Sequence, residues 1–253
     1  MPSGRAMISV DAVSHRFGDV AVLERLDLTV PSGGFASLVG PSGCGKSTLL
    51  RILAGLLVPT SGDAAIAGRS VVGRPGHSAY MPQRDLLLPW RRALGNATVG
   101  AEIAGLSPEE AQRRAEALFG TFGLDGFQRA WPAELSGGMR QRLALLRTFL
   151  CGRDVLLLDE PFGALDAITR RDMHVWLQQV LAADRRTVLL VTHDVEEALF
   201  LSDVVVVLSD RPARIVEQMP VDLARPRTLD AVTDDAFVAA KSKLLSALEA
   251  GRR

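Results

Sequence analysis

A glycine-rich run that ends in lysine and serine has the composition of a phosphate-binding loop. It follows the pattern GxxxxGK(S/T) and consists of Gly40, Pro41, Ser42, Gly43, Cys44, Gly45, Lys46 and Ser47. Its glycines tolerate dihedral angles closed to other residues, so the backbone amides can wrap a phosphate. Lys46 would neutralise the β and γ phosphates, Ser47 would ligate Mg²⁺, and Thr48 is placed to contact the α phosphate. A chance glycine-rich turn is the alternative.

The residues on either side of this run favour the phosphate loop over the chance turn. Residues 34–39 are expected to form a strand that ends at the run. After Thr48, apolar side chains recur at helical spacing, at Leu49, Ile52, Leu53 and Leu56. A loop between a strand and a helix N-terminus is where phosphate binds, because the first backbone amides of a helix point at the anion.

Two carboxylates follow an apolar strand further along the chain. Residues 155–158 (VLLL) precede Asp159 and Glu160, so both acids emerge where the sheet stops. Asp159 is expected to hold Mg²⁺ through water, and Glu160 to orient and deprotonate the attacking water in phosphoryl transfer. A helix cap or a turn is the alternative reading of such a pair. Because the chain also contains the phosphate loop, the catalytic interpretation of Asp159 and Glu160 is favoured.

The elements that position these residues indicate an α/β domain. Strands are expected at 20–30, 34–39, 155–158, 187–191 and 204–208, and intervening helices predict a mostly parallel core. Residues of about 86–135 lack strong strand signals, and a helical subdomain is predicted over about 86–150, with one helix beginning at Ser107 and Pro108. Residues of about 231–253 are expected to form one amphipathic helical tail. The whole chain, 1–253, is interpreted as a single domain.

Composition excludes several other classes of protein. Lysine plus arginine equals aspartate plus glutamate at 29 each, so no overall basic field attracts nucleic acid. The longest apolar runs fall far short of the roughly 20 residues that span a bilayer. No secretory signal is expected at the start of the chain. Cys44 and Cys151 have no metal-ligand spacing, and a reducing cytoplasm fits them best.

A further segment distinguishes among the many nucleotide hydrolases that share these motifs. Residues 135–142 (LSGGMRQR) resemble the signature of ATP-binding cassette (ABC) proteins. The resemblance implies a P-loop NTPase fold with an antiparallel β subdomain near the N-terminus and an inserted helical subdomain. It also implies ATP as ligand and a homodimer of two head-to-tail ATP-binding subunits. Across that dimer Ser136, Gly137 and Gly138 of one chain would contact the γ phosphate held by the other. A helix N-cap with a flexible approach is the alternative interpretation of LSGG taken alone.

The same resemblance assigns roles to residues that carry little signal alone. Phe17 would stack on adenine, and Gln83 would contact Mg²⁺ and the attacking water. His193 would contact the γ phosphate and hold Glu160 and the water in place. Residues 164–166 (ALD) look like the loop that couples the two active sites of the dimer.

Three segments are similar to the ABC importers for nitrate, sulfonates, taurine and thiamine-precursor pyrimidines. They are residues 81–90 (MPQRDLLLPW), 161–170 (PFGALDAITR) and 209–215 (SDRPARI). Residues 84–90 and 146–150 favour the pyrimidine branch.

The importer resemblance implies a peripheral protein at the cytoplasmic face of the membrane. Its partners would be an integral membrane permease and, indirectly, a solute-binding protein, with no nucleic acid. Residues 86–90 either line a permease-docking groove or pack the helical subdomain, and the sequence leaves both open. The alternative functions are the ATPase of a separate-chain exporter and a soluble ABC ATPase outside transport.

Overall fold

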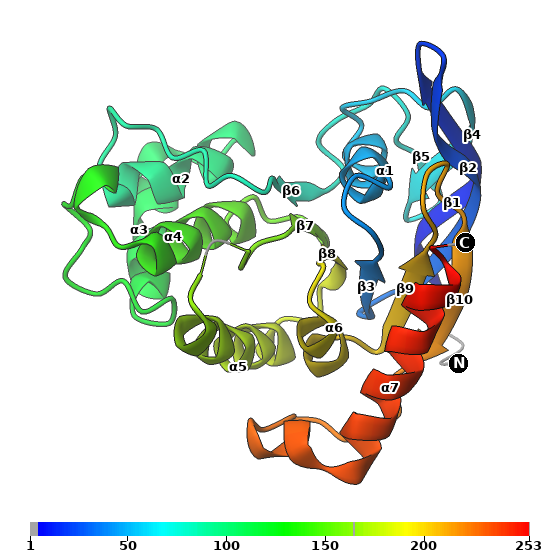
Figure 1. The fold of residues 1–253 in the computed structure, drawn as a ribbon. Helices are drawn as coiled ribbons and strands as arrows, with labels where there is room; N and C mark the ends of the chain where they lie inside the picture. The colour runs from blue at the N-terminus through cyan, green and yellow to red at the C-terminus, as the bar shows by residue number, and fades with distance from the viewer. Residues whose placement is uncertain (1–4, 164, 253) are drawn as a thin grey trace.

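Two sheets lie beside a lobe of helices in the computed structural model, which describes residues 5–163 and 165–252 (Figure 1). The first sheet is antiparallel throughout and has the strand order β2-β1-β4-β5. Its strands are β1 (Ala6–Phe17), β2 (Val20–Pro31), β4 (Ser61–Ile66) and β5 (Arg69–Ser70). The antiparallel subdomain expected near the N-terminus is therefore present.

The second sheet has six strands in the order β10-β9-β3-β8-β7-β6. Neighbours from β9 to β6 run parallel, and only β10 pairs antiparallel with β9. The strands are β3 (Phe35–Val39), β6 (Ala79–Met81), β7 (Val155–Asp159), β8 (Thr187–Val191), β9 (Val204–Leu208) and β10 (Ile215–Pro220). The predicted mostly parallel core sheet is confirmed.

Both faces of this sheet are covered. Successive strand residues point to opposite sides, so each strand contributes side chains to two core clusters. On β7, Leu156 and Leu158 pack in a core cluster with the helices that follow the sheet and with the helical lobe. Val155 and Leu157 point the other way, into a second cluster with the antiparallel sheet and α1 (Lys46–Leu53). The unbroken apolar run of this strand thus reflects burial on both sides.

Three helices of the lobe lie between β6 and β7, within the predicted helical region. They are α2 (Ala93–Ile103), α3 (Pro108–Phe119) and α4 (Gly137–Phe149), with a 3₁₀ turn at Pro132–Glu134. Helix α3 begins as predicted: the Ser107 hydroxyl accepts a hydrogen bond from the Glu110 amide at 3.2 Å, and Pro108 occupies the first turn.

The remaining helices are α5 (Ala167–Ala183), α6 (Val195–Leu201) and α7 (Asp235–Ala250), with a 3₁₀ turn at Asp230–Thr233. The expected single tail helix is thus a short turn followed by a helix, and α7 lies along β9 and β10 (Figure 1). In the part of the chain that the structure describes, no helix is long and apolar enough to cross a membrane.

Two expectations about the first third of the chain were wrong in detail. Strand β1 was not predicted, and Phe17 is its last residue. The register of β1 slips between Val10 and Val13, around Ala12 with φ 47°, which breaks the alternation that marks a strand. Leu56 is exposed outside α1, because the helix ends at Leu53 and Gly55 follows with φ 74°.

Candidate active site

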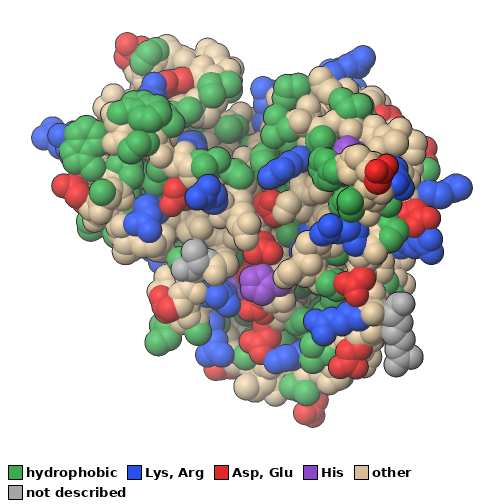
Figure 2. Space-filling view, turned by 45° about the horizontal axis from the view of Figure 1, so that its top comes forward, with side chains coloured by type: hydrophobic (Ala, Val, Ile, Leu, Met, Phe, Trp, Pro, Cys, Tyr) green, Lys and Arg blue, Asp and Glu red, His purple; other side chains and the backbone are tan. Residues whose placement is uncertain are grey.

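The phosphate loop and three catalytic candidates meet in one cleft of about 410 Å³. The reason is topological: the loops that follow parallel strands emerge at one edge of the sheet. Acidic side chains and a histidine gather near the middle of the face shown in Figure 2. The cleft is lined by Ser42, Gly43, Gly45, Lys46, Ser47, Thr48, Gln83, Glu160 and His193.

The phosphate loop wraps around the start of α1. Gly45 has φ 127°, and a Cβ there would stand 2.6 Å from Leu23 Cδ2, so both backbone and space require glycine. Lys46 Nζ donates hydrogen bonds to the carbonyl oxygens of Gly40 and Pro41, each at 2.8 Å. The ammonium group therefore lies over the loop, beside the helix N-terminus, where phosphate charge is favoured.

Asp159 and Ser47 come together at the inner end of the cleft. Ser47 Oγ donates to Asp159 Oδ1 at 2.9 Å, and Tyr80 Oη donates to Asp159 Oδ2 at 3.2 Å. Burial raises the pKa of Asp159, and these two hydrogen bonds oppose the rise.

This donor set fits Mg²⁺, which prefers oxygen and is bound by one or two carboxylates together with substrate phosphates. Among the described residues, no group of three or more His, Cys, Asp or Glu could hold a metal ion by itself. Mg²⁺ at Ser47 and Asp159 would take nucleotide phosphates as further ligands.

Glu160 is contacted from two sides. Gln83 Nε2 donates to Glu160 Oε2 at 2.9 Å, and His193 Nδ1 lies 3.4 Å from the same oxygen. Glu160 has φ 46°, a conformation rare for a side chain of this size and one that recurs at functional sites. His193 was expected beside Glu160, whereas the contact of Gln83 with Glu160 was not predicted; the three side chains form one cluster next to the phosphate loop.

The other predicted residues lie outside the cleft of their own chain. Phe17 is 51% exposed and packs edge-on against His15, with ring centroids 4.5 Å apart. Ser136 caps α4 by accepting from the Met139 amide at 3.2 Å, and Gly137 begins that helix. The other predicted site residues outside the cleft lining are Gly138, in α4, and three residues of the phosphate loop: Gly40, Pro41 and Cys44.

Cys44 and the loop 164–166 complete the predicted set. Cys44 is buried, which raises the pKa of its thiol, so its part in the loop is that of a small residue in a tight turn. Ala164 lies outside the described residues. Asp166 caps α5, because its carboxylate accepts from the amides of Ile168 and Thr169 at 3.1 and 3.0 Å.

Besides the contact of Gln83 with Glu160, two further contacts at the site were not predicted. Tyr80 reaches Asp159 because β6 lies beside β7, a neighbour relation that no local motif reveals. Arg211, in the loop after β9, donates from Nε to the Gly43 carbonyl at 2.9 Å. The position of Arg211 in SDRPARI was the only sequence signal, and it pointed to a subgroup of importers, with no contact implied.

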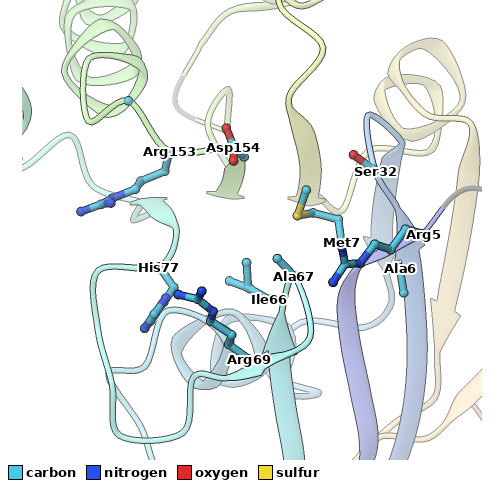
Figure 3. Close-up of a pocket in the computed structure, with 11 residues that line it drawn as sticks. Arg5, Ala6, Met7, Ser32, Ile66, Ala67, Arg69, His77, Arg153 and Asp154 are labelled. Carbon is cyan, nitrogen blue, oxygen red and sulfur yellow. The ribbon is translucent and has the colours of Figure 1, made fainter.

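A second cavity, of about 510 Å³, lies at the opposite end of the sheet, where Arg153 and Asp154 precede β7 (Figure 3). Arg5, Arg69 and His77 also line it, and their side chains are exposed. Since this cavity is at the amino ends of the parallel strands, it is separate from the phosphate loop.

Known proteins resemble this chain in sequence and structure. A family model described as "ABC transporter" matches residues 23–163. Aliphatic sulfonates import ATP-binding protein SsuB 1 of Rhodococcus jostii (strain RHA1) is 50% identical over 237 residues, which cover 93% of this chain and 91% of that protein. The SsuB protein of Rhodopseudomonas palustris (strain ATCC BAA-98 / CGA009) is 45% identical, covering 89% and 78%.

Two solved structures of the cassette MJ0796 share the fold. Its dimeric structure as a bacterial ABC transporter cassette has a TM-score of 0.76 and 27% identity. A dimeric post-hydrolysis state bound to ADP and Pi has a TM-score of 0.75 and 26% identity. Each match covers 86% of this chain and 100% of the other. With the phosphate loop, the carboxylate pair and the signature helix in place, the chain belongs to the ABC transporter family, as one of its ATP-hydrolysing cassettes.

Proposed function

We propose that this chain is the ATP-hydrolysing subunit of an importer for aliphatic sulfonates, working as a homodimer with Mg²⁺. The observation that carries the proposal is the Glu160 carboxylate, contacted by Gln83 and His193 at the edge of the phosphate loop. The relatives at 50% and 45% identity are named for aliphatic sulfonates, so we favour sulfonates over the pyrimidine branch.

In this mechanism the chain's own residues position and deprotonate water. Lys46 and the loop amides hold the β and γ phosphates, while Ser47 and Asp159 would hold Mg²⁺, which supplies neutralisation of phosphate charge. Glu160 accepts a proton from water as the water oxygen attacks the γ phosphorus and the bond to the β-phosphate oxygen breaks. His193 orients Glu160 and contacts the γ phosphate.

The position of the signature residues supports the homodimer. Ser136 caps α4, and Gly137 and Gly138 form its first turn, a helix N-terminus suited to phosphate, yet none of the three lines the cleft of its own chain. The dimeric MJ0796 structures support a second copy as the source of the missing signature residues. Phe17, exposed at the end of β1, is free to stack on adenine.

A permease partner is supported by the surface of the helical lobe. Leu86 is 55% and Trp90 72% exposed, and Leu87 packs against the core. Hydrophobic side chains gather on the lobe in Figure 2. Exposed apolar patches of this kind mark protein interaction sites. We place the chain as a peripheral protein at the cytoplasmic face of the membrane, with a solute-binding protein acting on the other side of the permease.

The test is ATP hydrolysis and ATP-dependent dimerisation of the wild type and Glu160→Gln, with Mg²⁺. Removing a general base costs about 10²–10⁴-fold in rate, while the phosphate loop stays intact. We expect hydrolysis to collapse and an ATP-bound dimer to accumulate. The matched control, Glu116→Gln on α3, should behave as wild type. Normal hydrolysis by Glu160→Gln would show that another group is the base, and failure of the wild type to hydrolyse ATP would refute the proposal.

A further inference from the structure

Two buried ionisable side chains meet behind the cleft, where α5 packs on α6. His174 Nε2 lies 3.4 Å from Glu197 Oε2, and the side chains are 8% and 4% exposed. Burial raises the pKa of Glu197, and the nearby imidazole opposes the rise. A buried ion pair is weak evidence for stability, because desolvation offsets the attraction. The contacts around the pair therefore decide what it does.

His174 touches the loop that carries Glu160. Its ring packs edge-on against Phe162, two residues after Glu160, with centroids 5.3 Å apart. On the other side, its ring centroid lies 6.1 Å from that of Phe200 in α6. The imidazole thus lies between the Glu160 loop and the helix that follows His193.

Arg170, one turn earlier on α5, makes a second connection between the same segments. Its guanidinium donates to Asp194 Oδ2 at 3.3 Å and to the Leu165 carbonyl at 2.8 Å. Asp194 directly follows His193 and caps α6. Two successive turns of α5 therefore hold the start of α6 against the catalytic loop.

We propose that His174 and Glu197 are positioning residues for ATP hydrolysis: the pair fixes the Glu160 loop against the helix after His193, most firmly while the pair carries a proton. The proposal rests on the roles of Glu160 and His193 proposed above. With the proton present, the pair is either imidazolium with carboxylate or imidazole with carboxylic acid, and in both forms a donor faces an acceptor; when the proton leaves, the attraction between the two side chains falls and α6 is held less tightly. A displacement of 1 Å at a catalytic group costs about 10²-fold in rate.

Charged side chains lie beside the pair on both helices. Arg170 and Arg171 are on α5, Asp194 and Glu196 are at the start of α6, and the catalytic loop contributes the uncharged ring of Phe162. On the α7 side, Lys241 pairs with Glu196 at 2.5 Å. The proton on His174 and Glu197 is therefore the variable charge at this contact.

The first experiment compares His174→Ala with Gln178→Ala. Gln178 is a buried polar residue one turn further along α5, and it hydrogen-bonds the backbone of Arg227 at 2.8 and 2.9 Å, away from the catalytic loop. We expect His174→Ala to lower kcat about 10–100-fold with the KM for ATP unchanged. Gln178→Ala should lower Tm comparably and keep wild-type kcat. Equal losses of kcat, or wild-type kcat in His174→Ala, would overturn the proposal.

His174→Gln provides a second test should the alanine variant not fold. The amide keeps a donor toward Glu197 but binds no proton, so it imitates the pair after proton loss. The ratio of its kcat to the wild-type kcat should rise toward one as pH increases, and any pH dependence that both proteins share cancels in this ratio. A ratio independent of pH contradicts the proposal. The Glu160→Gln variant tests the proposed function separately, because its substitution changes no residue of α5.

Discussion

At Asp159, burial and charge act against each other. The carboxylate is 3% exposed, and burial raises its pKa although Ser47 and Tyr80 donate to it. The folded state therefore binds a proton more tightly than the unfolded state, and the charged form costs stability at neutral pH. We interpret this cost as the consequence of holding a metal-binding carboxylate in the apolar end of a strand.

We expect Asp159→Asn to stabilise the nucleotide-free chain and to abolish Mg²⁺-dependent hydrolysis. The penalty is absent below the ordinary pKa of aspartate, grows as pH rises through the raised pKa, and is full above it. The Tm gain should be about 2–4 °C at neutral pH, the shift that about 1 kcal/mol gives a chain of this size. Thermal unfolding from acid to neutral pH checks it, and a Tm gain that does not grow with pH would show that charge is not the cause.

At the scale of the elements, α2 and α4 approach closely at a glycine. A Cβ at Gly100 would stand 2.5 Å from the Arg147 carbonyl oxygen and 2.6 Å from Cys151 Sγ. Gly95 lies on the same helix, where the atoms nearest to an added Cβ belong to the Arg91 side chain, at 3.6 Å or more. This close approach helps to pack the helix that begins with the signature residues against the rest of the lobe.

We expect Gly100→Ala to destabilise the chain by about 1–3 kcal/mol, because the added methyl group must push the two helices apart. The matched substitution Gly95→Ala should stabilise it by up to about 1 kcal/mol, since alanine is the better helix former and has space. Urea unfolding of both variants measures the difference. Equal effects would mean that the α2–α4 contact adjusts without cost.

At the scale of the whole molecule, residues 86–90 had two interpretations, permease docking and packing of the helical lobe, and the burial of each side chain bears on both. Trp90 is 72% exposed, whereas Leu87 packs against the core of the lobe. The segment therefore combines a buried anchor with an exposed aromatic side chain, and large exposed aromatics are typical of interface anchors.

We expect Trp90→Ala to leave the free energy of unfolding within about 0.5 kcal/mol and to weaken permease association by about 2 kcal/mol or more. Binding to the reconstituted permease, with unfolding of the isolated chain in parallel, measures both. The control is Trp131→Ala in the same lobe, which removes a contact with Arg92 at 4.4 Å and should affect stability instead. Unfolding of Trp90→Ala would assign this side chain to the core.

Much of the site could be predicted from local sequence. Residues 40–48 and Asp159–Glu160 are contiguous motifs whose backbone chemistry depends on their own types, so their strand, loop and helix contexts followed directly. The strands from 155, 187 and 204 were equally visible, because burial on both faces requires unbroken apolar runs. Strand β1 was missed because a bulge interrupts its alternation.

The tertiary structure decided what depends on partners distant in the chain. Sheet order and helix packing decide that Trp90 is exposed. They also bring together three pairs of residues: Tyr80 with Asp159, Arg211 with Gly43, and His174 with Glu197. The type of a single residue does not reveal which distant residue it contacts, since any apolar run fits a core and any polar residue fits the surface. The sequence by itself determined the phosphate chemistry, because that chemistry is local; only the fold determined which side chains surround it.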